Sequence, residues 1–210
     1  TILPRENGGV TVLLDVGANA DCKPDVLYQF GVLGSLFSQY VCGIKKPKVS
    51  LLNLGEEKTK GNLLTQAAYT LMADNIDFEF IGNCEGRDIF NSKSDVIVCD
   101  GFEGNIALKA SEGVAKMFSY FIKKSFTKNL FTQLVAILAK PVMRDFRSKV
   151  DPGKYNGASL LGLKGVVVKS HGNADIDSFQ QAIKEAYLEA HAKITDKISE
   201  QLTRELEEHK

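Results

Sequence analysis

The sequence predicts an α/β fold: a doubly wound, mostly parallel sheet with helices on both faces, a protruding helical hairpin and a long C-terminal helix. Short, almost entirely apolar runs recur along the chain, as in strands that are buried on both faces of a sheet. Longer segments with helical spacing separate these runs, and such alternation is typical of parallel strands joined by right-handed crossovers. The 210 residues, of which 44% are hydrophobic and 25% charged, suffice for one compact domain over 1–210.

Five short runs are predicted to be strands because nearly every residue in each run is apolar or β-branched. Segments that repeat apolar residues at intervals of three and four are predicted to be helices. In chain order the expected strands are 10–16, 49–54, 78–81, 96–99 and 166–168, and the expected helices are 25–41, 62–72 and 106–121.

The C-terminal stretch 176–208 is predicted to be one long helix. Asp175 or Asp177 is expected to cap its start, and an apolar stripe runs along it through Ile183 and Tyr187. Such a stripe requires a partner surface. The sequence leaves two partners open, namely the chain's own sheet and a second copy of the chain in a dimer.

Residues 114–150 are predicted to form a protruding helical insertion. From 113 to 150 there are eight basic residues and one acidic residue, so this part carries a charge of +7 within a chain of zero net charge. Apolar residues alternate with the basic ones, and Pro141 is expected to break or kink the helix. Cationic and apolar faces on one hairpin suit an anionic membrane surface or an acidic carrier protein, and dimer packing with a solvated basic rim is the alternative. The residues expected to make the membrane or carrier contact are Lys123, Lys124, Lys128, Leu134, Leu138 and Arg144.

Each expected strand runs into a loop that is rich in Gly, Asn, Asp and Lys. These loops are 15–19, 53–62, 82–88, 100–105 and 171–173. In doubly wound sheets, ligands bind outside the carboxyl ends of the strands. Gly permits close backbone approach, Asn supplies a neutral donor and acceptor, and the start of a helix offers free N–H groups to an anion. Turn geometry and helix capping also favour Gly and Asn, but five such loops in succession favour a phosphate cradle.

Motifs of several enzyme classes do not occur. The absence of G-x-G-x-x-G, G-x-x-x-x-G-K-[ST], H-E-x-x-H and G-x-S-x-G counts against dinucleotide dehydrogenases of the usual kind, P-loop NTPases, zincins and α/β-hydrolases. The four scattered cysteines favour reduced thiols over a disulfide framework or a zinc site, and neither a metal nor a cofactor is expected. Zero net charge gives no reason to expect nucleic acid as a partner. With no signal peptide and no apolar run of about 18 residues, a cytoplasmic location is expected.

Taken together, several of these loops closely resemble motifs of the bacterial phosphate acyltransferase family. The matching segments are Leu13-Leu14-Asp15-Val16-Gly17-Ala18-Asn19, Asn53-Leu54-Gly55-Glu56-Glu57 with Lys60-Gly61-Asn62, Gly82-Asn83 with Glu85-Gly86-Arg87-Asp88, Asp100-Gly101-Phe102 with Gly104-Asn105, and Lys169-Ser170-His171-Gly172. The resemblance implies transfer of a fatty acyl group from acyl-[acyl carrier protein] to inorganic phosphate, giving acyl phosphate for phospholipid synthesis. It also implies a cytoplasmic homodimer that associates peripherally with the membrane. Family members carry a further N-terminal segment, so this sequence is expected to be the C-terminal part of a longer chain.

The resemblance and the chemistry together assign roles to individual residues. Phosphate is already a good nucleophile near neutral pH and a thioester expels a thiolate readily, so the protein must mainly position the phosphate and stabilise an oxyanion. Lys60 and Asn105 match family motifs and are predicted to be catalytic: Lys60 holds the phosphate or the developing charge, and Asn105 orients the same group. The predicted substrate-binding residues are Asn19, Asn53, Gly61, Asn62, Gly101, Gly104, Lys109, His171 and Gly172.

Two other functions remain open at this point. Similar loops could serve a phosphate acetyltransferase or acyltransferase that uses coenzyme A thioesters. The hairpin could instead belong to a non-catalytic scaffold that docks lipid-synthesis enzymes at the membrane.

Overall fold

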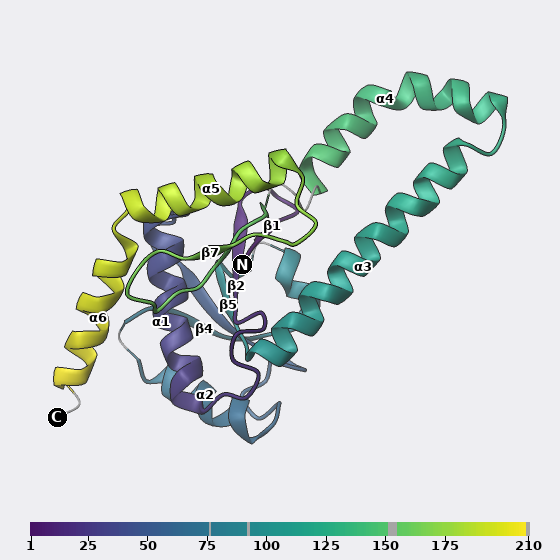
Figure 1. Cartoon of the computed structure of the whole chain (residues 1–210). Coiled ribbons are helices and arrows are strands. Elements are labelled where there is room, and N and C mark those ends of the chain that lie inside the picture. Colours follow the sequence, from purple (N-terminus) through teal and green to yellow (C-terminus); the bar gives the residue numbers. More distant parts are fainter. Residues whose placement is uncertain (76, 92, 151–154, 209–210) are drawn as a thin grey trace.

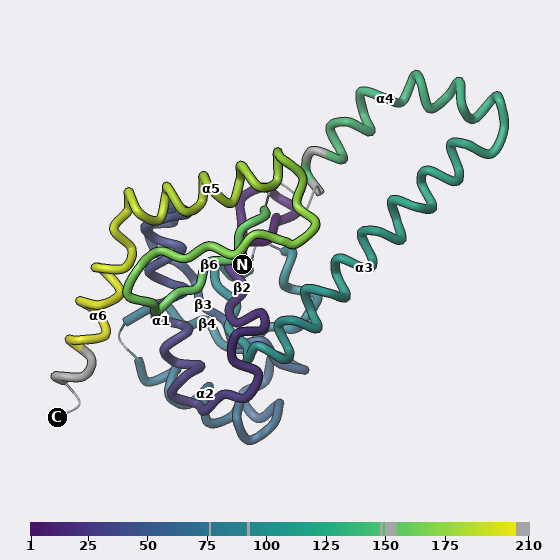
Figure 2. Tube along the Cα trace, in the orientation of Figure 1, coloured from purple at the N-terminus to yellow at the C-terminus, as the bar shows by residue number. Residues whose placement is uncertain are grey.

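A computed structural model describes residues 1–75, 77–91, 93–150 and 155–208, and its arrangement is shown in Figures 1 and 2. A five-stranded sheet of order β1-β2-β5-β3-β4 lies at its centre. The neighbouring strands from β2 to β4 pair in parallel, and β1 pairs with β2 in the antiparallel sense. The predicted α/β class with a mostly parallel sheet is confirmed. The strands are β1 (Ile2–Pro4), β2 (Val10–Leu14), β3 (Lys48–Leu52), β4 (Glu79–Cys84) and β5 (Val96–Val98).

Each central strand buries residues on both faces, which explains why the runs in the sequence are almost wholly apolar. On one face the core contains Val12, Val49 and Val96, packed against α1 (Pro24–Tyr40), α2 (Leu63–Ala73) and the start of α6 (Ile194–Glu208). On the opposite face Leu13, Leu52 and Ile97 pack with the 3₁₀ helix η1 (Gly86–Phe90) and with Ala107 and Leu108 of α3 (Gly101–Phe126). The first face therefore holds the larger core.

The fifth predicted strand is not part of this sheet. Residues 166–168 overlap β7 (Val168–Lys169), which pairs only with β6 (Ala158–Ser159) in a separate antiparallel hairpin. The chain reverses after Leu160, whose N–H donates to the carbonyl of Val167 at 2.9 Å. β7 thus lies next to β6 in the chain and pairs with it instead of with the main sheet. In contrast, β1 was not predicted, because three residues are too few to show a period.

The C-terminal stretch is helical as expected, but it forms two helices instead of one. α5 (Ile176–His191) begins at Asp175, whose carboxylate accepts from the N–H of Ser178 at 2.9 Å. Lys193 then adopts a φ of 51°, which ends α5 and turns the chain. The turn lets Ile194 and Ile198 of α6 pack into the sheet's core, and this burial favours the break over a continuous helix.

The predicted hairpin consists of α3 and α4 (Leu130–Val150), and it projects from the body of the protein (Figure 1). The side chain of Asn129 accepts from the N–H of Thr132 at 2.9 Å and caps the start of α4. Pro141 lies inside α4, so the expected break at this residue does not occur. Pro141 is exposed, where water can solvate the carbonyl that loses its N–H partner. Among the described helices, none is long and apolar enough to cross a bilayer.

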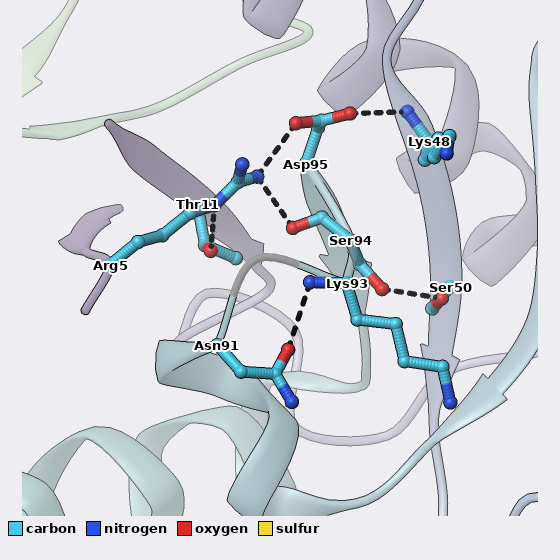
Figure 3. A network of polar contacts seen from close by, with 8 residues as sticks. All are labelled: Arg5, Thr11, Lys48, Ser50, Asn91, Lys93, Ser94 and Asp95. Atoms are coloured by element: carbon cyan, nitrogen blue, oxygen red, sulfur yellow. Dashed lines mark hydrogen bonds and ion pairs between the residues drawn. The ribbon is translucent and has the colours of Figure 1, made fainter. Parts of the chain in front are cut away.

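A polar network joins the strands at the end of the sheet where β3 and β5 begin (Figure 3). Arg5, whose side chain is 9% exposed, donates to the Thr11 hydroxyl at 3.0 Å and to the Asp95 carboxylate at 2.8 Å. Asp95 in turn accepts from the backbone N–H of Lys48 at 2.8 Å, and the Ser50 and Ser94 hydroxyls lie 2.7 Å apart. These contacts hold the amino ends of β3 and β5 together, at the end of the sheet opposite to the loops that follow these strands.

Candidate functional site

The strand order brings the first turn of α3 to the middle of the sheet's carboxyl edge. β5, which leads into α3, lies between β2 and β3, so the loop after β2 flanks α3 on one side and the loop after β3 on the other. The N–H of Gly101 donates to the carbonyl of Asn19 at 2.8 Å and joins the start of α3 to the loop after β2. Segments far apart in sequence therefore meet at one place, as the sequence predicts.

Gly104 allows α3 to pack directly on the chain after β2. A Cβ atom at this position would lie 1.8 Å from the carbonyl oxygen of Asp15 and 2.7 Å from the sulfur of Cys99. No other residue fits without displacing backbone. Gly104, which is buried, thus acts on the site by setting how closely the two loops approach.

Asp15 organises the loop that follows β2. Its buried carboxylate accepts from the backbone N–H groups of Gly17 at 2.9 Å, Ala18 at 3.0 Å and Asn19 at 2.7 Å, and from the side-chain amide of Asn19 at 3.0 Å. Burial alone would raise the pKa of Asp15, but these donors outweigh burial and the pKa is lowered. In the predicted ligand Asn19, one side-chain N–H therefore bonds within the loop, and the backbone carbonyl bonds to the start of α3.

Asn105 stands at the junction of the same two loops. A Cβ atom at Gly17 would lie 3.7 Å from both Cβ and Cγ of Asn105, so the Asn105 side chain lies against the Gly17 backbone. Asn105 is also exposed and sits in the first turns of α3, close to the N–H groups of the helix start. A donor in this position can reach an anion bound at the carboxyl edge.

The loop between β3 and α2 forms the wall of an open pocket of about 340 Å³. Gly61 has a φ of 94°, and a Cβ atom there would lie 2.5 Å from Asn53 Oδ1, so the tight turn requires glycine. Asn62 caps α2, since its Oδ1 accepts from the N–H of Thr65 at 2.9 Å. The pocket is lined by Leu52, Asn53, Leu54, Gly61, Asn62, Thr65, Gly86 and Glu103, so it joins predicted ligands from this loop to α3.

Lys60 lies in this loop with an exposed side chain. Its carbonyl accepts from the Asn53 amide at 3.2 Å and its N–H donates to the carbonyl of Glu57 at 3.0 Å, so the backbone is fixed on both sides. Among the described residues, no carboxylate forms an ion pair with its ammonium group. Lys60 is therefore available to an incoming anion.

Two features of the site were not predicted from the sequence. Glu103 lines the pocket and is half-buried, and burial followed by the charge of Asp100 raises its pKa. Its position in the loop 100–105, two residues before Asn105, was the available signal. The second feature is a rim of exposed apolar side chains around the same loops, formed by Leu54, Leu63, Phe102 and Ile106, of which Leu63 is 87% exposed.

Three predicted ligands lie apart from this arrangement or are already paired. Lys109 extends from α3 and forms an ion pair with Glu112 at 3.0 Å. His171 and Gly172 lie between β7 and α5, beside the two-stranded sheet. There the backbone N–H of His171 donates to Asn156 Oδ1 at 2.9 Å, and its Nδ1 accepts from the N–H of Asn173 at 3.1 Å. A role for these three residues in phosphate binding stays a prediction.

The thiols near the site are poorly suited to nucleophilic catalysis. Cys84 and Cys99 are buried at strand ends, and burial raises the pKa of Cys84 to about 12 and that of Cys99 well above its ordinary value. Neither thiol supplies a thiolate nucleophile at neutral pH. Within the part of the chain that the structure describes, no three His, Cys, Asp or Glu residues are grouped to hold a metal ion.

Comparison with known proteins gives a consistent result. A family model described as "Fatty acid synthesis protein" matches residues 1–197. A phosphate acyltransferase of Ruthia magnifica subsp. Calyptogena magnifica is 56% identical over 200 residues, which are 95% of this chain and 58% of the relative. Phosphate acyltransferases of Polaromonas sp. (strain JS666 / ATCC BAA-500) and Alkalilimnicola ehrlichii are 47% and 46% identical over 205 and 195 residues, covering 96% and 93% of this chain and 55% and 57% of those relatives. The chain thus spans somewhat more than half the length of the relatives it matches.

Proposed function

Because the chain belongs to the fatty acid synthesis protein family, which includes the phosphate acyltransferases it resembles, we propose that it transfers a fatty acyl group to inorganic phosphate. The proposed donor is the thioester of acyl-[acyl carrier protein], and the product is acyl phosphate for phospholipid synthesis. The observation that supports the proposal is that the β3–α2 loop, which carries Lys60 and Asn62, and the first turns of α3, which carry Asn105, follow neighbouring strands at one edge of the sheet and both contribute to the pocket lining.

The chemistry follows from the positions of these groups. Phosphate binds in the pocket beside Asn53 and Asn62, and the Lys60 ammonium neutralises part of its charge. An oxygen of phosphate attacks the thioester carbonyl, and the Asn105 amide together with N–H groups at the start of α3 stabilises the oxyanion that forms. The carbon–sulfur bond then breaks and the thiol leaves. Fixing both reactants at attack distance is the main contribution of the protein.

The apolar rim supports a fatty acyl donor in particular. Leu54 lines the pocket, Leu63 and Phe102 adjoin lining residues in the sequence, and together with Ile106 these side chains are 52% to 87% exposed. Apolar side chains that are rimmed by polar groups mark binding surfaces for apolar ligands. In this proposal, the rim covers the chain next to the thioester while the carbonyl reaches the pocket.

The hairpin supports contact with an anionic membrane surface or with an acidic carrier protein. Leu134 and Leu138 are 62% and 81% exposed on α4, and Lys123, Lys124, Lys128 and Arg144 are exposed on the same hairpin. Such a surface gains free energy from burying apolar area and from attraction to acidic groups. We also propose a homodimer, since the apolar side chains of α3, α4 and α5 offer self-complementary area that one chain leaves uncovered.

One experiment tests the function directly. The chain is incubated with a long-chain acyl-[acyl carrier protein] and phosphate, and acyl phosphate and free carrier protein are measured by mass spectrometry. Phosphate-dependent loss of the thioester is the expected result. Preference for coenzyme A thioesters would move the assignment to the alternative donor, and an absence of turnover with either donor would contradict the enzyme assignment.

A further inference from the structure

We propose that Glu103 selects hydrogen phosphate against fully deprotonated anions such as sulfate, by accepting a hydrogen bond from the proton that hydrogen phosphate carries. The inference rests on the proposed function, because it concerns the anion that binds in the same pocket. It adds a specificity residue to that pocket and explains why a carboxylate stands where an anion must bind.

The backbone of Glu103 is held firmly at the edge of the pocket. Asp100 caps α3, and its Oδ1 accepts from the N–H of Glu103 at 2.7 Å. Across the pocket lie Asn53, Gly61 and Asn62 from the loop between β3 and α2. Glu103 is half-buried, so its carboxylate is only partly solvated by bulk water.

Both asparagine side chains of the pocket already accept hydrogen bonds. Oδ1 of Asn53 accepts from the N–H of Leu54 at 2.8 Å, and Oδ1 of Asn62 accepts from the N–H and the hydroxyl of Thr65 at 2.9 Å and 3.2 Å. Among the residues that the structure describes, none donates a hydrogen bond to the carboxylate of Glu103 and none forms an ion pair with it. The pocket therefore presents one carboxylate acceptor without a donor.

An acceptor without a donor distinguishes anions by whether they carry a proton. Hydrogen phosphate and hydrogen arsenate each have one O–H group, which can donate to the carboxylate and offset the repulsion between the negative charges. Sulfate has no such proton near neutral pH, so it meets only the repulsion and leaves the acceptor unpaired. Burial, followed by the charge of Asp100, raises the pKa of Glu103, so the distinction is expected to be strongest at alkaline pH.

The test is a set of binding titrations with the 210-residue chain at about pH 8. Phosphate, arsenate and sulfate are each titrated by calorimetry. The wild type is expected to bind phosphate and arsenate at least about tenfold more tightly than sulfate. In Glu103→Gln this preference is expected to fall to about twofold or less, because a neutral amide can donate to any of the three anions. Glu112→Gln, on the same helix and outside the pocket, is the matched control and is expected to keep the preference.

Two results would overturn the inference. One is equal affinity of the wild type for sulfate and phosphate, and the other is an unchanged preference in Glu103→Gln whose circular dichroism matches the wild type. If Glu103→Gln does not fold, equal affinity of the wild type for arsenate and sulfate still overturns the inference. If the chain forms acyl phosphate but binds sulfate and phosphate with equal affinity, the proposed function stands and the role of Glu103 is wrong. If the chain neither forms acyl phosphate nor binds phosphate or arsenate, both proposals are wrong.

Discussion

The α-carbon of Gly104 faces the carbonyl oxygen of Asp15 so closely that a Cβ atom there would lie 1.8 Å from that oxygen. Gly104→Ala is therefore expected to push α3 away from the loop after β2, and to lower the free energy of unfolding by about 1–3 kcal/mol. The displacement also moves Asn105, so activity is expected to fall. Chemical denaturation and the acyl phosphate assay measure the two effects.

Gly113→Ala is the matched control on the same helix. Apart from its chain neighbours and the backbone of its own helix, no atom lies within 4 Å of the position that its Cβ would take. This variant is expected to raise the free energy of unfolding by up to about 1 kcal/mol, because alanine favours the helix over glycine. Equal stability of the two alanine variants would contradict the close packing at Gly104.

Lys60→Ala and Asn105→Ala are each expected to reduce the rate of acyl phosphate formation by about 10²- to 10³-fold, since each removes a group placed to stabilise charge at the reacting atoms. Both side chains are exposed, so the free energy of unfolding is expected to change by less than about 0.5 kcal/mol. Lys58→Ala is the control in the same loop, because the Lys58 ammonium lies over the Tyr69 ring, 5.6 Å from its centroid. A near-normal rate in a folded Lys60→Ala or Asn105→Ala variant would contradict the catalytic role of that residue.

Leu134→Glu combined with Leu138→Glu is expected to abolish sedimentation with anionic vesicles, because it places two charges in the exposed apolar surface of α4. Gln133→Glu combined with Ser125→Glu makes the same change in charge at exposed polar positions of the hairpin. This control is expected to weaken binding only as far as charge alone dictates. Equal binding by the wild type and the leucine variant would rule out the apolar contact.

Glu189 is expected to make the stability of the protein depend on pH. It is 2% exposed, the Ser159 hydroxyl donates to it, and burial raises its pKa to about 7, with the charge of Glu185 contributing in the same direction. The folded state thus holds a proton that the unfolded state releases at lower pH, so stability is lost as the pH rises from about 4.5 through 7. Glu189→Gln is expected to remove this loss and to gain on the order of 2 kcal/mol above pH 8 relative to the wild type.

Thermal unfolding from pH 5 to 8.5 would measure the effect, with Glu200→Gln as the exposed control on α6. Parallel pH profiles for the wild type and Glu189→Gln would show that the Glu189 carboxylate does not control this dependence.

The parts of the fold that were predicted correctly are those governed by local pattern. The runs around Val12, Val49 and Val96 are apolar on both faces because both faces are covered, and this leaves a clear mark in the sequence. The break at Lys193 leaves no such mark, because it depends on the burial of Ile194 and Ile198 against a distant core. Pro141 was expected to break or kink the helix; α4 continues through it at an exposed position, and a kink there stays a prediction.

The same distinction holds at the site. The glycines and asparagines of the loops could be recognised from residue type and spacing. The sequence does not show which of their polar atoms form hydrogen bonds within the protein. One amide N–H of Asn19, for example, donates to Asp15, which the sequence does not show, and the role of Asn19 in substrate binding stays a prediction. Glu103 was not predicted, because its position at the pocket depends on the order of the strands, which the sequence does not show.

α3 runs without interruption from Gly101 at the carboxyl edge to Phe126 in the hairpin (Figure 2), a length of about 39 Å for 26 residues. A hydrogen-bonded helix of this length is stiff, and α3 is held at its start by the packing of Gly104 on Asp15. Because the hairpin and the first turn belong to one helix, we expect a tilt of the hairpin to shift Glu103 and Asn105 as well. In the proposed function, such a shift would link contact between the hairpin and a surface to the alignment of the reactants.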